Sequence, residues 1–172
     1  MAKPDKYYLE LQQKLANSNA KELIETIKEI KHSGKPQILP LVIRLLNKHK
    51  SDEVGKEVLI LLGQLKDVNV IPFIIDEIKS TNSDAYKAEL IMTCWQSGLD
   101  YSEYITDFTQ EFISGDFQAS IESFSVIEEW IHNATKETVE QSRKLLINNL
   151  ENTPEEKKAF YIELIKLVES YL

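Results

Sequence analysis

Cysteine and long apolar runs are both scarce in this sequence. Cys94 is the only cysteine among the 172 residues, so no internal disulfide can form. It stands in an apolar stretch without a basic neighbour, and we predict a small core side chain rather than a reactive thiol. The longest aliphatic run covers only residues 58–62, too short for a membrane span, and the charged start lacks a signal-peptide core. We therefore expect a cytoplasmic protein without membrane contact.

Glycine and proline are also few, with five residues of each, and the strict alternation typical of strands is missing. Apolar residues instead recur at intervals of three and four along nearly the whole chain, the spacing of one face of an α-helix. The sequence therefore predicts an all-α protein. The predicted helices span residues 6–16, 19–32, 36–49, 52–66, 70–79, 84–97, 102–114, 117–132, 136–150 and 154–171.

Several helix boundaries have a local cause. Thr153, Pro154 and Glu156 have the spacing of a capping box, in which the hydroxyl and the carboxylate each satisfy a backbone N–H at the start of a helix. Three glycines follow helical patterns where a left-handed C-terminal residue is expected: Gly34, Gly98 and Gly115. The three histidines stand at predicted helix ends, where we expect them to cap carbonyl groups: His32, His49 and His132.

The chain also repeats itself. Three aspartates recur at one constant interval, each where its side chain can cap the following helix: Asp52, Asp84 and Asp116. Shifting the sequence by that same interval also places Pro40 on Pro72, together with the apolar residues around them. Self-similarity at a period of roughly 20–50 residues is typical of helical repeat proteins, in which each helix pair stacks on the next.

The repeated pattern resembles HEAT repeats. The segments that carry the resemblance are Ile-Leu-Pro-Leu-Val at 38–42, Asp-Glu-Val at 52–54, Leu-Leu-Gly-Gln-Leu at 61–65 and Val-Ile-Pro at 70–72. Lys56 and Lys87 are the nearest equivalents of the Arg often found in the second helix of such repeats. The resemblance implies a right-handed α-α superhelix of about five stacked helix pairs. The implied domain covers residues 1–172, with the clearest repeats in 36–132 and flanking capping pairs at 6–33 and 136–171.

In HEAT-like proteins the second helices of successive pairs line a concave face. The repeat register places Glu57 in line with Glu89 and Glu122, and it places Gln64 in line with Gln96 and Glu129. Two interpretations remain open. The two rows either face a ligand, or they are ordinary exposed positions, where Glu and Gln are common because both favour helix and water.

Basic residues are absent from one long stretch. Residues 88–135 hold no Lys or Arg and nine Asp or Glu, whereas residues 1–57 hold eleven basic and eight acidic residues. The acidic stretch is also rich in aromatic residues, most of which recur at helical spacing and are predicted to lie in the core. We single out Tyr86, Trp95 and Trp130 as candidate surface anchors, although the sequence does not decide whether Trp95 and Trp130 are core or surface.

These features favour a non-enzymatic adaptor or scaffold that binds a protein or peptide of basic character on an acidic concave face. The hypothetical partner-binding residues are Glu57, Gln64, Tyr86, Glu89, Gln96, Glu122, Glu129 and Trp130. No motif for catalysis, cofactor binding or metal binding is found.

Two alternatives remain. HEAT-like proteins include bacterial DNA glycosylases for alkylated bases, but a DNA-binding groove should be basic. The chain could also be a structural subunit of a larger assembly. We expect a monomer, with a homodimer as the alternative.

Overall fold

The structure is a computed structural model that describes residues 6–31, 36–49, 52–81 and 84–172. These residues form ten α-helices and five short 3-10 helices, with no strand among them. The all-α prediction is therefore confirmed. The α-helices are α1 Lys6–Asn17, α2 Ala20–Ile30, α3 Leu39–Lys48, α4 Glu53–Gly63, α5 Ile71–Ser80, α6 Asp84–Ser97, α7 Ile105–Ser114, α8 Phe117–Trp130, α9 Lys136–Asn149 and α10 Glu155–Glu169.

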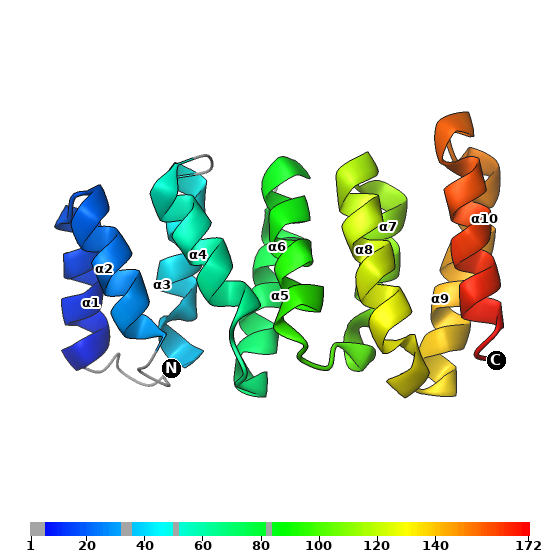
Figure 1. Cartoon of the computed structure of the whole chain (residues 1–172). Helices are drawn as coiled ribbons and strands as arrows, with labels where there is room; N and C mark the ends of the chain where they lie inside the picture. Colours follow the sequence, from blue (N-terminus) through cyan, green and yellow to red (C-terminus); the bar gives the residue numbers. More distant parts are fainter. Residues whose placement is uncertain (1–5, 32–35, 50–51, 82–83) are drawn as a thin grey trace.

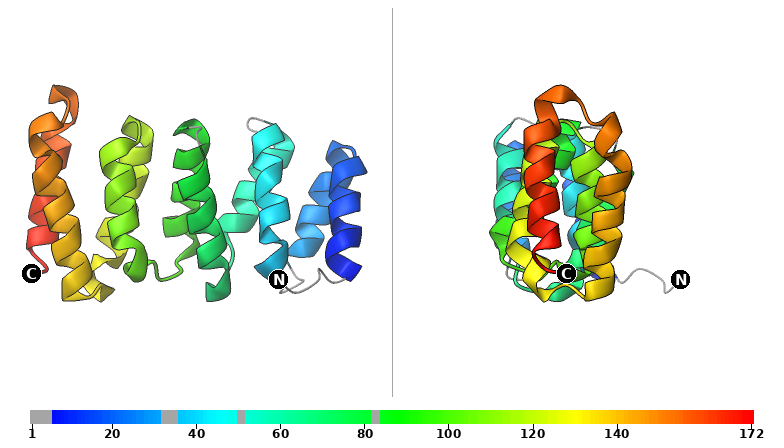
Figure 2. Two further views of the ribbon diagram at one scale, coloured as in Figure 1. Left: turned by 180° about the vertical axis from the view of Figure 1, so that it is seen from behind. Right: turned by 90° about the vertical axis from the view of Figure 1, so that its right-hand side faces the viewer.

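The helices stand side by side in an elongated row that follows the order of the chain (Figure 1). Seen from the end of the row, they form two layers (Figure 2). The even-numbered helices are nearest the reader in Figure 1, and α6 packs more extensively against α4 and α8 than against α5, its neighbour in the chain. Helices α2, α4, α6 and α8 therefore form a continuous layer with one exposed side.

The core runs along the row between the layers. In α4, Val54, Val58, Leu61 and Leu62 are buried, as the apolar spacing predicts, while Leu65 beyond the helix is half-buried. Each of these side chains recurs at an interval of three or four residues, so one stripe of the helix packs against its neighbours. The opposite stripe of α4 remains available at the surface.

Two of the three predicted aspartate caps are confirmed. A carboxylate oxygen of Asp52 accepts hydrogen bonds from the backbone N–H groups of Val54 and Gly55, at 2.9 and 3.1 Å. Asp116 accepts one from Ala119 N at 2.8 Å. The side chain of Asp84 lies outside the described residues. The equivalent starts of α4 and α8 thus share one local cause.

The capping box predicted at residue 153 is wrong. Helix α10 begins at Glu155 without a side-chain cap, and the Thr153 hydroxyl donates instead to the carbonyl of Asn149, at 3.0 Å. Thr153 is buried, so its hydroxyl is directed back to the end of α9. A capping box does form at the start of α2, where Asn19 and Glu22 bond reciprocally at 3.0 and 3.1 Å.

The glycines that follow helices are required for different physical reasons. Gly98 has a φ of 64°, as predicted for a left-handed C-terminal residue. Gly115 is extended, with a φ of −74°, so the predicted conformation is wrong there. A Cβ at Gly115 would lie 2.7 Å from Glu111 O and 2.8 Å from Ala119 Cβ, so this glycine permits a close approach of α7 and α8. Gly34 lies outside the described residues.

Candidate functional site

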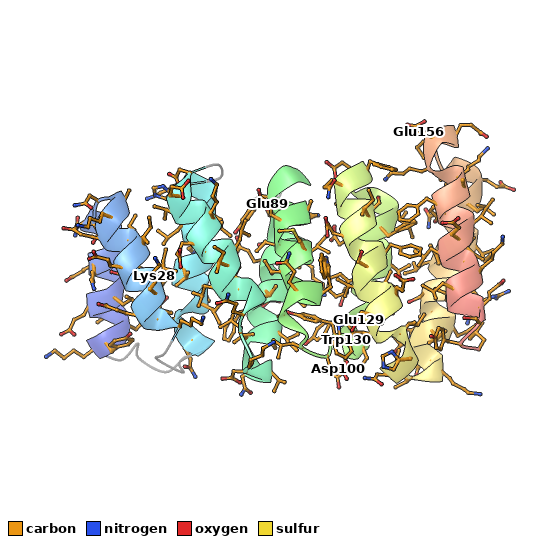
Figure 3. The ribbon with its side chains drawn as sticks, viewed as in Figure 1. Lys28, Glu89, Asp100, Glu129, Trp130 and Glu156 are labelled. Atoms are coloured by element: carbon orange, nitrogen blue, oxygen red, sulfur yellow. The ribbon has the colours of Figure 1, made fainter. Side chains whose placement is uncertain are left out.

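Helices α2, α4, α6 and α8 meet at three successive junctions, and five of the eight predicted binding residues lie at them. Figure 3 marks this side of the molecule with Lys28 on α2, Glu89 on α6 and Glu129 on α8. We name the side chains at the junctions the even-helix face. Its members are Lys28, Lys31, Glu57, Ile60, Gln64, Glu89, Met92, Trp95, Gln96, Gln118 and Glu122.

The α2–α4 junction holds a groove of about 320 Å³. Glu57 Oε2 lies 3.8 Å from Lys28 Nζ, at the long end of ion-pair distances. Lys31 Nζ donates to the side-chain oxygen of Gln64 at 2.6 Å. Between these polar pairs, Ile60 projects from α4 with half of its surface exposed. Glu57 and Gln64 therefore lie at one groove, and each contacts a lysine. Glu57 contacts Lys28 of α2, and Gln64 contacts Lys31 just beyond the end of α2.

At the α4–α6 junction a side chain of α6 packs closely against a glycine of α4. A Cβ on Gly63 would lie 3.1 Å from Gln96 Oε1 and 3.4 Å from Gln96 Cβ, so the glycine makes room for Gln96 against α4. Just beyond α4, Lys66 Nζ donates to the carbonyl of Ser97 at the end of α6. Gln96 remains exposed and lies between the two outer junctions.

The α6–α8 junction holds a second groove, of about 260 Å³. Its lining combines apolar residues with three acids, and none of the described residues that line it is Lys or Arg. The lining residues are Ala88, Glu89, Met92, Asp116, Gln118 and Glu122. The predicted pair Glu89 and Glu122 is therefore brought to a single groove, on facing helices.

Glu122 is held in place at this groove by two side chains. It is only 8% exposed, and its carboxylate accepts hydrogen bonds from Trp95 Nε1 at 2.8 Å and from Gln118 Nε2 at 2.6 Å. Both donors are neutral, so they orient the carboxylate without neutralising it. The position of the Glu122 side chain is thus set by two neighbouring side chains, unlike that of an ordinary solvated residue.

The acidic stretch contributes fewer free charges than its sequence indicates. Lys79 pairs with Asp107 at 2.7 Å, and Lys87 pairs with Glu111 at 2.8 Å, so the lysines that precede the stretch neutralise two of its acids. Glu111 is also buried. Three acids of the stretch are exposed and bond to no other described residue: Glu103, Glu128 and Glu129.

The negative charge of Asp100 is favoured at the end of α6. Burial by itself raises the pKa of this carboxyl, but hydrogen bonds from Ser102 N at 2.8 Å and from Asn133 Nδ2 at 3.0 Å bring the pKa below its ordinary value. Asp100, Glu129 and Trp130 lie in the same region of Figure 3. Glu129 is therefore placed at the C-terminal end of α8, away from the groove at its start.

The aromatic candidates divide three ways. Tyr86 is not a surface anchor: it is 1% exposed, because it reaches inward to α3, where its hydroxyl donates to the carbonyl of Ile43 at 3.0 Å. Trp95 is 39% exposed and belongs to the even-helix face. Trp130 is half-buried and stacks on His132, with ring centroids 6.2 Å apart.

Five members of the face are not among the residues that the sequence predicted: Lys28, Lys31, Ile60, Met92 and Gln118. The repeat register contains the signal, because Lys28, Ile60 and Met92 follow one another at the same interval as the capping aspartates. Ile60 and Met92 each lie three residues after a glutamate of the row, one helical turn further along the same face.

The described residues contain no group of three or more His, Cys, Asp or Glu side chains that could hold a metal ion. Cys94 is fully buried, and burial raises the pKa of its thiol to about 12, which agrees with the predicted core position. His49 Nδ1 lies 2.7 Å from Asp52 Oδ2, so its ring contacts a carboxylate rather than a helix carbonyl.

No described helix is long and apolar enough to cross a membrane. Comparison with protein-family models, with curated proteins and with solved structures finds no match to this chain.

Proposed function

We propose that the chain is a HEAT-like helical repeat protein that binds a basic protein or peptide through the even-helix face and has no enzymatic activity. The proposed architecture is a right-handed superhelix of about five helix pairs. It is supported by the packing of α2 on α4, α4 on α6 and α6 on α8, since each pair of a repeat protein contacts the next. The common register of the face residues supports the same arrangement.

The observation that carries the proposal is the α6–α8 groove. Met92 and Ala88 give it an apolar wall, while Glu89, Asp116 and Glu122 supply negative charge. A lysine or arginine side chain matches this combination, because its aliphatic stem packs on apolar surface while its charged head meets carboxylates. Duplex DNA does not match it, because the phosphates would be repelled.

Binding of a short fluorescent peptide rich in Lys and Arg tests the proposal, with anisotropy as the readout. We expect binding that weakens as salt is added, because exposed charges are screened. The Glu89→Lys variant should bind at least about threefold more weakly, since one attractive contact becomes repulsive. Glu122→Lys is a poorer test, because it also removes the hydrogen bond to Trp95.

Glu163→Lys is the matched control, because Glu163 is exposed on α10, outside the even-helix face. It makes the same change in net charge and should bind the peptide nearly as well as the wild type. Equal binding by the wild type and Glu89→Lys would remove the groove as the site. A wild type that shifts a short DNA duplex but ignores the peptide would support the nucleic-acid alternative.

A further inference from the structure

The two grooves of the even-helix face differ in charge. Glu57 and Ile60 of α4 correspond to Glu89 and Met92 of α6, one repeat later in the sequence. In the first groove these residues face the preceding helix α2, where two lysines line the groove, whereas in the second they face the following helix α8, which with its cap contributes two acids. The two grooves therefore present opposite electrostatic character.

The α2–α4 groove has an excess of positive charge. Its lining holds two lysines and one glutamate. Lys28 is 62% exposed and lies at the long distance of 3.8 Å from Glu57. Among the described residues, Lys31 Nζ bonds to the neutral amide of Gln64, and no described carboxylate lies within ion-pair distance of it. A carboxylate from a partner could therefore pair with Lys31 without displacing another ion pair.

The α6–α8 groove has the reverse imbalance. Its lining holds three acids and no basic side chain. Lys157 lies close enough to Asp116 for the two charges to interact, but its Nζ is held by the carbonyl of Gly115 at 2.6 Å and the hydroxyl of Ser120 at 2.8 Å. Lys157 therefore lies at the start of α8 and is not among the residues that line the groove.

We propose that the even-helix face binds an extended peptide segment of mixed charge, with an acidic residue in the α2–α4 groove and a basic residue in the α6–α8 groove. This inference rests on the proposed function and specifies its partner. Each groove meets a charge of opposite sign, whereas the reversed placement brings like charges together. The face therefore selects a charge pattern rather than basic character alone.

The layer sets the spacing of the two charges. Neighbouring packed helices lie about 8–10 Å apart, so two grooves separated by two helix steps lie about 16–20 Å apart across the layer. An extended chain advances about 3.3 Å per residue, which puts the acidic and basic residues about six positions apart. Gln96 lies between the grooves and is exposed, and its amide can both donate to and accept from an extended backbone.

Three fluorescent peptides of equal length test the inference. One has acidic and basic residues about six positions apart, one has basic residues at both positions, and one has acidic residues at both. We expect the mixed peptide to bind the wild type about threefold more tightly than the all-basic peptide, because one further ion pair forms. The all-acidic peptide should bind most weakly.

The Lys31→Glu variant should reverse this preference. Lys31 is exposed and forms no ion pair with the described residues, so the change alters the charge of one groove without opening a salt bridge. The all-basic peptide should then bind more tightly than the mixed peptide. Lys166→Glu, at an exposed position of α10, makes the same charge change away from the face and should keep the wild-type preference.

The outcomes separate this inference from the proposed function. If the wild type binds the all-basic peptide as tightly as the mixed one, or more tightly, the mixed-charge partner is wrong while the basic-partner proposal survives. If the wild type binds none of the peptides, both are wrong. An unchanged preference in Lys31→Glu would also overturn the assignment of the acidic residue to the α2–α4 groove.

Discussion

At the scale of single residues, the pair formed by Lys87 and Glu111 stands apart from the other ion pairs. The two side chains are only 15% and 11% exposed, and their charged atoms lie 2.8 Å apart. They join α6 to α7. A charge that loses its partner in such surroundings is strongly destabilising, whereas removal of both charges can be nearly neutral.

We therefore expect Lys87→Met to lower the free energy of unfolding by about 3 kcal/mol, because Glu111 stays buried without a partner. Urea denaturation followed by circular dichroism measures this. The double variant Lys87→Met, Glu111→Leu should recover most of the loss. Lys56→Ala, which removes an exposed pair with Glu53, is the control and should leave stability nearly unchanged. A loss in Lys87→Met no larger than in this control would contradict the prediction.

Asp100 gives stability a dependence on pH. Its pKa in the folded protein is lower than in the unfolded chain, where it lies near 3.8, so the folded state prefers the charged form. The stabilising contribution is complete above the unfolded pKa and is lost as the pH falls through the folded pKa.

In Asp100→Asn, this charge is absent at every pH. We therefore expect the variant to be less stable than the wild type near neutral pH, and we expect the difference to shrink below about pH 4. Unfolding free energies measured by urea titration at several pH values test this. A stability difference that stays constant from neutral to acidic pH would show that the charge of Asp100 does not matter.

At the scale of helices, the turn between α7 and α8 depends on the lack of a side chain at Gly115. A Cβ there would approach Glu111 O and Ala119 Cβ more closely than van der Waals contact allows. Gly115→Ala should therefore destabilise the protein by about 1–3 kcal/mol, because the backbone of the turn must shift. Thermal unfolding measures the effect.

The double variant Gly115→Ala, Ala119→Gly is the matched test of the mechanism. It removes one of the two clashing atoms while keeping the alanine at the turn. Its additional loss relative to Ala119→Gly alone should be smaller than the loss caused by Gly115→Ala in the wild type. Equal losses would show that the contact with Ala119 is not the cause.

The positions of the helices could be predicted because their causes are local. Apolar spacing placed all ten to within a few residues, and Asp52 and Asp116 act as caps through atoms two or three residues away. The predictions that failed concern side chains whose surroundings depend on contacts between distant segments of the chain. Tyr86 is buried with a bond to Ile43, far earlier in the chain, and Glu111 is neutralised by a lysine of another helix. No pattern within one helix contains that information.

At the scale of the whole molecule, the same distinction applies to the candidate site. The repeat register brought Glu57, Gln64, Glu89, Gln96 and Glu122 to successive junctions. It did not indicate that several of these side chains would have partners on the neighbouring helices. That part depends on how closely the even-numbered helices pack, which the spacing of residues along one helix does not determine.

The separation of charge along the row of helices has a further physical consequence. Basic residues outnumber acidic ones in residues 1–57, whereas residues 88–135 hold nine acids and no Lys or Arg. An elongated body with such a distribution has an electric dipole moment with a component along its long axis. The field of an approaching charged molecule therefore exerts a torque and rotates the protein before contact. At about 0.1 M salt the field decays over about 10 Å, so this rotation is confined to the last steps of approach.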